Sequence, residues 1–67
     1  MQITVVTLNA VIYPSRARKY HKVIEDSKSY YRILSANGVS DTILKDDIES
    51  LIYWNESDWN RYIEESK

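Results

Sequence analysis

The chain has 67 residues, a formal net charge of −1 and 43% apolar residues, among them six Tyr and two Trp. It contains no cysteine, which excludes a disulfide-stapled scaffold, a thiolate metal site and a cysteine nucleophile. No apolar stretch approaches the roughly 20 residues that span a bilayer, and no basic segment precedes the first apolar run. We therefore expect one small cytoplasmic domain that does not use a membrane.

The first part of the chain has the composition of two β-strands. Residues 3–13 are rich in β-branched and apolar side chains and are closed by Pro14, which predicts a strand followed by a turn. A polar connection then leads to a second strand, which we expect to start near Arg18 or Lys19 and to end near Glu25. Turn-forming residues at 26–29 separate it from the next run, so the two should pair as an antiparallel hairpin.

The middle of the chain carries the sharpest local signal. Asn37-Gly38 lies between the β-prone residues 30–34 and 39–44, and this pair favours a type I′ turn because both of its positions need positive φ. Gly38 is the only glycine of the chain, as expected where a Cβ is penalised. Residues 45–49 predict one helical or 3₁₀ turn, followed by a fifth strand at 51–53.

The last residues predict a short amphipathic helix within 55–67. Asn55 or Ser57 is suited to cap it, and Trp59, Tyr62 and Ile63 fall at i, i+3 and i+4 on one face. A helix of about ten residues is marginal alone. It should therefore pack on the β-domain of residues 1–54 or on a partner.

The stretch from Lys19 to Glu49 carries a series of short motifs in a fixed order. These are Val23-Ile24-Glu25-Asp26, Tyr30-Tyr31-Arg32-Ile33, Gly38, Leu44-Lys45-Asp46 and Ile48-Glu49. The series resembles the small Src homology 3-like β-barrel proteins of bacteriophages and mobile elements of low-GC bacteria. The resemblance implies a mainly β fold, a five-stranded half-open barrel, here with a short C-terminal helix added. It carries over no binding residues, because one fold hosts many functions.

The sequence gives little support for catalysis. His21 is the only histidine, and no nucleophile or carboxylate stands at a spacing that would pair with it. A half-buried or edge position on a strand, on the same face as Val23, accounts for it. The scattered carboxylates and single glycine make neither a metal site nor a phosphate loop. We expect no enzyme activity, no metal and no cofactor.

A basic run is the first candidate site. Its members are Arg16, Arg18, Lys19 and Lys22, with Tyr20 and His21 among them. Cations beside aromatic rings suit a surface that contacts phosphates and stacks on bases. The alternative is a solvated loop followed by an edge strand, which charge protects from pairing with other chains.

An acidic and aromatic tail is the second candidate site. Its aromatic members are Tyr53, Trp54, Trp59 and Tyr62, which lie among four carboxylates. Trp and Tyr are enriched at protein–protein hot spots, so an exposed patch of this kind would bind a protein. The alternative is that Trp54 and Trp59 close the end of a small barrel. A compromise between the two is that one tryptophan is in the core and the other is partly exposed.

A third candidate is the tyrosine set Tyr13, Tyr20, Tyr30 and Tyr31. Tyr30 and Tyr31 are consecutive strand residues and must face opposite sides of the sheet, one toward the core and one toward the surface. A Src homology 3 domain grips proline-rich peptides with such rings.

The two ends of the chain differ in charge. Residues 1–40 hold six Lys/Arg and two Asp/Glu, a net +4, and residues 41–67 hold three and eight, a net −5. This asymmetry is compatible with a homodimer. We expect a small non-enzymatic phage or mobile-element protein that binds a host or phage protein in the host cytoplasm and inhibits it, for example a defence or replication component. The alternative is a nucleic-acid-binding barrel.

Overall fold

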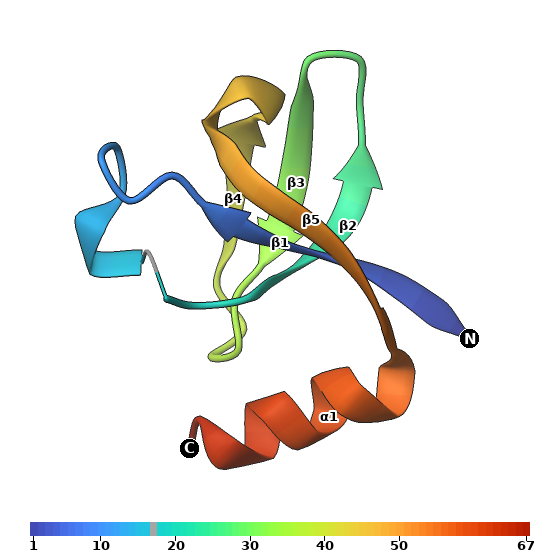
Figure 1. Cartoon of the computed structure of the whole chain (residues 1–67). Helices are drawn as coiled ribbons and strands as arrows, with labels where there is room; N and C mark the ends of the chain where they lie inside the picture. The colour runs from blue at the N-terminus through green and yellow to red at the C-terminus, as the bar shows by residue number, and fades with distance from the viewer. Residues whose placement is uncertain (17) are drawn as a thin grey trace.

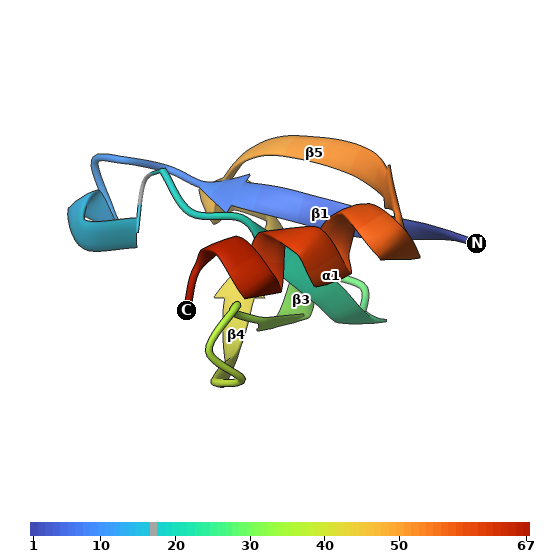
Figure 2. The same cartoon turned by 90° about the horizontal axis from the view of Figure 1, so that it is seen from below.

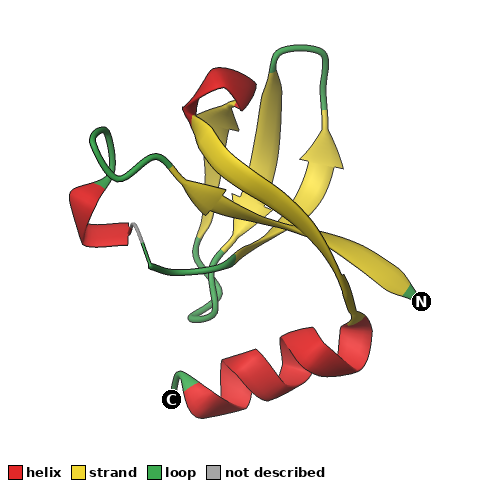
Figure 3. Cartoon of the chain, in the orientation of Figure 1, coloured by secondary structure: helices red, strands yellow, loops and turns green. Residues whose placement is uncertain are grey.

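The structure is a computed structural model of the whole chain and describes residues 1–16 and 18–67. Five strands and one α-helix are connected by loops and two 3₁₀ turns (Figures 1 and 3). In chain order the elements are β1 (Gln2–Leu8), η1 (Pro14–Arg16), β2 (His21–Asp26), β3 (Tyr30–Leu34), β4 (Ser40–Leu44), η2 (Lys45–Asp47), β5 (Ile48–Asn55) and α1 (Glu56–Glu65). The expected five strands and C-terminal helix are confirmed.

All five strands form one antiparallel sheet in the order β4-β3-β2-β1-β5. β1 and β4 are separated by two strands in this order, yet Val6 and Leu8 of β1 share one buried cluster with Ile43 of β4. The sheet must therefore curl around these side chains, as its path in Figure 1 shows. We call the side that carries them the inner face.

The inner face holds an aliphatic core. Val6, Leu8, Ile33 and Ile43 are buried, and partly buried side chains pack around them, including that of Tyr31. Of the two consecutive tyrosines, Tyr31 thus contacts the core, as predicted. Tyr30 is half-buried on the other side.

β1 is buried on both of its faces. Val5 and Val6 are both fully buried, although consecutive strand residues point to opposite sides. Val5 shares a face with Ile3, which lies opposite Trp54 of β5. Trp54 contacts Trp59 of α1, with ring centroids 6.5 Å apart, and Figure 2 shows α1 running back alongside β1 from the end of β5. The helix therefore covers the outer face at this end of the sheet.

The first two strands are shorter than predicted. β1 ends at Leu8 because Asn9 starts a turn: its side-chain oxygen accepts the Val11 N–H at 2.9 Å and its carbonyl accepts the Tyr13 N–H at 2.8 Å. Val11 is 91% exposed, so β-propensity does not extend the strand without a surface to cover it. β2 begins at His21 rather than near Arg18 or Lys19.

The type I′ turn predicted at Asn37-Gly38 is wrong. No described residue other than glycine has positive φ, and Gly38 has a φ of +87°. The Gly38 N–H donates to the Ser35 carbonyl at 3.0 Å and the Ser35 N–H to the Val39 carbonyl at 2.9 Å. This is a three-residue loop made of a type I turn and a left-handed glycine.

The second half of the chain follows the prediction more closely. The 3₁₀ turn forms at Lys45–Asp47, but β5 begins directly after it and is longer than the expected 51–53. Asn55, rather than Ser57, is the N-cap of α1, and its N–H donates to Asp58 Oδ2 at 3.2 Å. The expected face forms, with Trp59 buried and Tyr62 and Ile63 half-buried.

Candidate functional site

A groove with a volume of about 470 Å³ lies at the end of the sheet beside α1. Three segments line it: the approach to β2 (Arg16, Lys19, Tyr20), the β3–β4 turn (Ser35, Ala36, Asn37, Val39), and the end of α1 with the two residues that follow it (Tyr62, Ile63, Ser66, Lys67). Figure 1 shows the β3–β4 turn pointing toward α1. We call this cavity the end groove.

The floor of the end groove is a polar layer that continues the inner face of the sheet. Val23 and Asp41 both lie opposite Ile33 in the strand register, so Asp41 shares the face of the aliphatic core. His21 precedes Val23 by two residues and lies opposite Val6. Both His21 and Asp41 line the groove. The core therefore ends in titratable side chains rather than in apolar ones.

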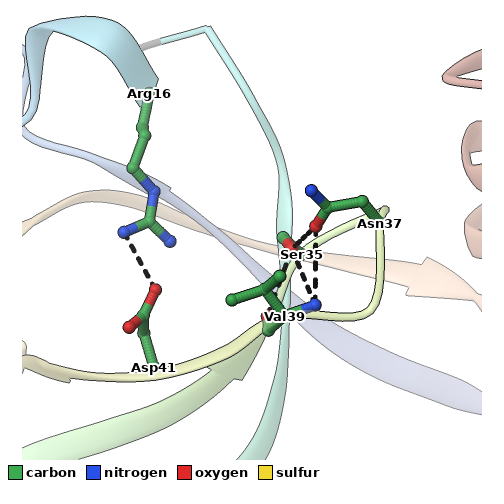
Figure 4. A network of polar contacts seen from close by, with 5 residues as sticks. All are labelled: Arg16, Ser35, Asn37, Val39 and Asp41. Carbon is green, nitrogen blue, oxygen red and sulfur yellow. Dashed lines mark hydrogen bonds and ion pairs between the residues drawn. The ribbon is translucent and has the colours of Figure 1, made fainter.

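An ion pair crosses the groove. Arg16, the last residue of η1, places Nη1 at 3.1 Å from Asp41 Oδ2 (Figure 4). The Arg16 guanidinium also lies 5.9 Å from the centre of the Tyr13 ring. The exposed fractions of the two charged side chains are 26% for Arg16 and 43% for Asp41. This contact ties the long loop after β1 to strand β4.

The polar side chains of the β3–β4 turn are used within the turn. The Ser35 hydroxyl lies within donating distance of two acceptors, Asn37 Oδ1 and the Val39 carbonyl oxygen, the latter at 3.1 Å, and it accepts the Val39 N–H at 3.2 Å (Figure 4). These bonds fix the shape of the turn. The isopropyl group of Val39, which is 54% exposed, is left as an apolar part of the groove wall.

His21 is the buried titratable group of the site. It is only 1% exposed, and its Nδ1 has no hydrogen-bond partner among the described residues. Burial lowers the pKa of His21 from its ordinary 6.5, the Arg16 cation lowers it further, and Asp41 and the Lys19 carbonyl act in the opposite direction. The imidazole is therefore held in its neutral form near pH 7.

Ser35, His21 and Asp41 are the residue types of a hydrolytic triad, and all three line the groove. Their hydrogen bonds point elsewhere: Ser35 bonds within its turn, Asp41 pairs with Arg16, and His21 Nδ1 bonds to neither. A triad needs the base bonded to the nucleophile and oriented by the carboxylate. The arrangement does not have this geometry.

Four aromatic rings form a wall next to the groove. The ring centre of Tyr20 lies 4.8 Å from that of Trp54 and 5.5 Å from that of Tyr62, and the Trp59 and Tyr62 centres are 5.6 Å apart. The Tyr62 hydroxyl also accepts the Tyr20 N–H at 3.1 Å. Aromatic contacts at such distances are favourable. This aromatic cluster of Tyr20, Trp54, Trp59 and Tyr62 holds α1 against the sheet.

The structure brings together only part of the predicted basic site. Arg16 and Lys19 line the end groove, whereas Arg18 and Lys22 do not. Lys22 is half-buried opposite Val5, toward the outer face. The alternative of a charge-protected edge is wrong, because β2 lies between β1 and β3. The prediction of an edge or half-buried His21 is also wrong, because β2 is an inner strand and the His21 side chain is fully buried.

The predicted aromatic site is not one exposed patch. Trp59 is 3% exposed, and Trp54 and Tyr62 are half-buried in the aromatic cluster. Of the four side chains only that of Tyr53 is exposed, at 65%. Tyr53 and Trp54 are successive residues of β5 and so face opposite sides. One tryptophan is in the interior and the other is partly exposed, which is the compromise that the sequence suggested.

The groove lining also contains residues that were not among the predicted candidates, including Val39, Asp41, Ile63 and Lys67. For Asp41 a signal existed. It alternates with Ile43 along β4, so it is a carboxylate at an inward position of a strand, where charge is rare. The other three come close to the groove only through the packing of α1 and the shape of the β3–β4 turn.

Within residues 1–16 and 18–67, no three His, Asp or Glu side chains gather in a way that could hold a metal ion. In the same part of the chain, no helix is long and apolar enough to cross a membrane. Comparisons with protein-family models, with curated proteins and with solved structures find no match for the chain.

Proposed function

We propose that the chain is a small non-enzymatic binding protein and that it engages a protein partner through the end groove. The observation that carries the proposal is the groove itself, an open cavity whose lining includes the apolar side chains of Val39 and Ile63 and the cations Arg16 and Lys19. Ligand sites are typically concave, apolar surfaces with a few placed polar groups. The chemistry of the floor is that of an ion pair and a neutral histidine, which suits recognition better than catalysis.

The fold supports a further part of the proposal. β1 pairs with both β2 and β5. The strands β2, β3 and β4 form a meander, and a 3₁₀ turn separates β4 from β5. This arrangement agrees with the resemblance to the Src homology 3-like barrels of phages and mobile elements. We propose on this basis that the chain acts in a host cytoplasm and inhibits the protein that it binds by covering one of its surfaces.

The test is affinity purification of the tagged chain from its host, compared across matched variants. Val39→Asp places a charge on the groove wall. Leu44→Asp is its control, because Leu44 lies outside the groove and its exposed fraction of 56% is close to the 54% of Val39. Lys19→Glu and Lys28→Glu form a second such pair. A partner that is lost in both groove variants and kept in both controls is expected. Equal capture by all four variants would refute the groove as the binding surface.

The second candidate is nucleic-acid binding, favoured by one observation: two of the four predicted cations, Arg16 and Lys19, line the groove beside Tyr20. The ring of Tyr20 is occupied by Trp54 and Tyr62, however, which limits stacking on a base. Binding of single- and double-stranded DNA and RNA is measured at low and moderate salt. Affinity that falls steeply with salt and is lost in Arg16→Glu/Arg18→Glu would favour this candidate over the first.

A further inference from the structure

Most polar groups around the end groove already have partners inside the protein. The hydroxyls of Ser35 and Ser66 donate to backbone carbonyls, and that of Tyr62 accepts the Tyr20 N–H. Lys67 Nζ pairs with Glu64 of its own helix at 3.2 Å. Arg16 and Lys19 are therefore the two cations of the groove lining that are not paired with a carboxylate of α1.

Arg16 is only partly satisfied by Asp41. The contact joins Nη1 to a single carboxylate oxygen, although a guanidinium has five donors and binds a carboxylate best through two parallel hydrogen bonds. Figure 4 shows the second terminal nitrogen of Arg16 without a dashed contact to the residues drawn. The guanidinium is nevertheless held in place by Asp41 on one side and by the Tyr13 ring. It is an oriented donor group with unused capacity.

The charged side chains at the floor of the end groove have a net positive charge that one negative group would balance. Arg16 and Lys19 carry two positive charges and Asp41 one negative charge, and His21 is neutral at pH 7. One carboxylate would balance this set. A nucleic-acid backbone, by contrast, needs several cations along its path, and the lining of the groove also includes the apolar side chains of Val39 and Ile63. A single acid next to an apolar residue is the chemistry of a peptide.

We propose that the end groove receives an acidic side chain from an extended segment of a partner protein, and that Asp41 is an internal stand-in for it. In the free protein Asp41 forms the ion pair with Arg16. In the complex the incoming carboxylate replaces Asp41 on Arg16 and also uses the donors that Asp41 leaves unpaired, with Lys19 beside it, while the neighbouring apolar residue of the segment covers Val39 and Ile63. This inference rests on the proposed function, because it names the partner chemistry of the same groove.

The test uses two capped five-residue peptides that differ in one group. One has a central glutamate between valines, and the other has glutamine at that position. Binding is followed by backbone amide NMR shifts and by tryptophan fluorescence, for which Trp54 and Trp59 stand next to Tyr62 of the groove wall. We expect the glutamate peptide to bind about tenfold more tightly, because hydrogen bonds to charged groups are the stronger ones.

Variants separate the roles of the charged residues. Arg16→Gln should remove the preference for glutamate, and Arg32→Gln, which changes an exposed arginine of β3 outside the groove, should leave it intact. Asp41→Asn should tighten binding of the glutamate peptide several-fold, because it removes the competing carboxylate. Weaker binding in Asp41→Asn would overturn the stand-in role.

The remaining outcomes distinguish this inference from the proposed function. If both peptides shift the groove amides equally, the groove binds peptide but the acidic chemistry is refuted. If neither peptide shifts them, the inference is refuted, while the partner captured through Val39 and Lys19 would still support the proposed function. If a DNA or RNA oligonucleotide displaces the peptide with a steep salt dependence, both are overturned.

Discussion

Two hydrophobic clusters, one on each face of the sheet, both lie against β1. We call them the inner and the outer centre, and they differ in composition and in how they are shielded from solvent. On the inner face the aliphatic core is fully enclosed by the curled sheet. On the outer face the aromatic cluster is closed by α1 alone, and three of its four rings remain half-buried. The inner centre therefore holds the sheet together, whereas the outer centre attaches one helix to it. Since the end groove lies between sheet and helix, its shape depends on the weaker of the two.

The largest expected effect comes from opening the inner centre. Ile33→Ala removes a fully buried side chain and should lower the free energy of unfolding by about 2–5 kcal/mol, a large share of what a small domain has. Urea unfolding followed by circular dichroism measures this. Ile24→Ala is the matched control, because Ile24 is 46% exposed on β2, and it should cost far less. Equal losses would contradict the larger contribution of the buried Ile33 side chain.

Trp59→Ala should break the outer centre without breaking the inner one. A buried tryptophan is worth about 3–5 kcal/mol in a rigid site, but here detachment of α1 limits the loss. Hydrogen exchange should show unprotected amides in α1 and protected amides in β3, since local opening does not require global unfolding. Simultaneous loss of protection in both elements would show that the two centres form one cooperative unit.

Gly38→Ala tests the turn that forms one wall of the groove. No atom outside the neighbouring residues lies within 4 Å of the position that a Cβ would take, so the cost is conformational. A left-handed φ in a residue other than glycine costs about 1–2 kcal/mol. Gly38→Asn should cost less, because asparagine tolerates this region. Thermal unfolding ranks the variants, and an alanine variant as stable as the parent would contradict the left-handed turn.

The smallest effect appears only on acidification. Because the pKa of folded His21 lies below its ordinary 6.5, the unfolded chain binds a proton first as the pH falls. Stability is unaffected above pH 6.5, falls as the pH drops below it, and levels off once the pH is below the folded pKa. His21→Gln should flatten this part of the curve. The groups that face His21 are Arg16, Lys19 and Asp41. An unchanged slope would contradict the role of His21 in the pH dependence.

Local sequence signals predicted the elements of the sheet well where the chain is regular. The strand at residues 30–34, the 3₁₀ turn after Leu44 and the helix face of Trp59 all follow from alternation, turn residues and helical spacing. The ends of β1 and the type of the β3–β4 turn did not follow, because both are decided by hydrogen bonds such as the one from Val11 to Asn9.

The candidate site was harder to predict from the sequence than the fold. Arg16 and Lys19 were predicted as part of a basic surface, but their partners come from β4 and α1, which lie far away along the chain. The aromatic tail was recognised as a cluster of contact residues, yet only burial shows that Trp59 packs against its own sheet. Pairings over such distances depend on how the sheet curls, which no local pattern encodes.

The double burial of β1 has a consequence for how the chain acquires its structure. β2, β3 and β4 are joined by short turns and can pair early, whereas β1 pairs along its whole length with β5. Such a distant pairing carries the entropy cost of closing a long loop. β1 is thus among the last strands to be enclosed, and Val5 and Val6 lose their contact with water in that late step.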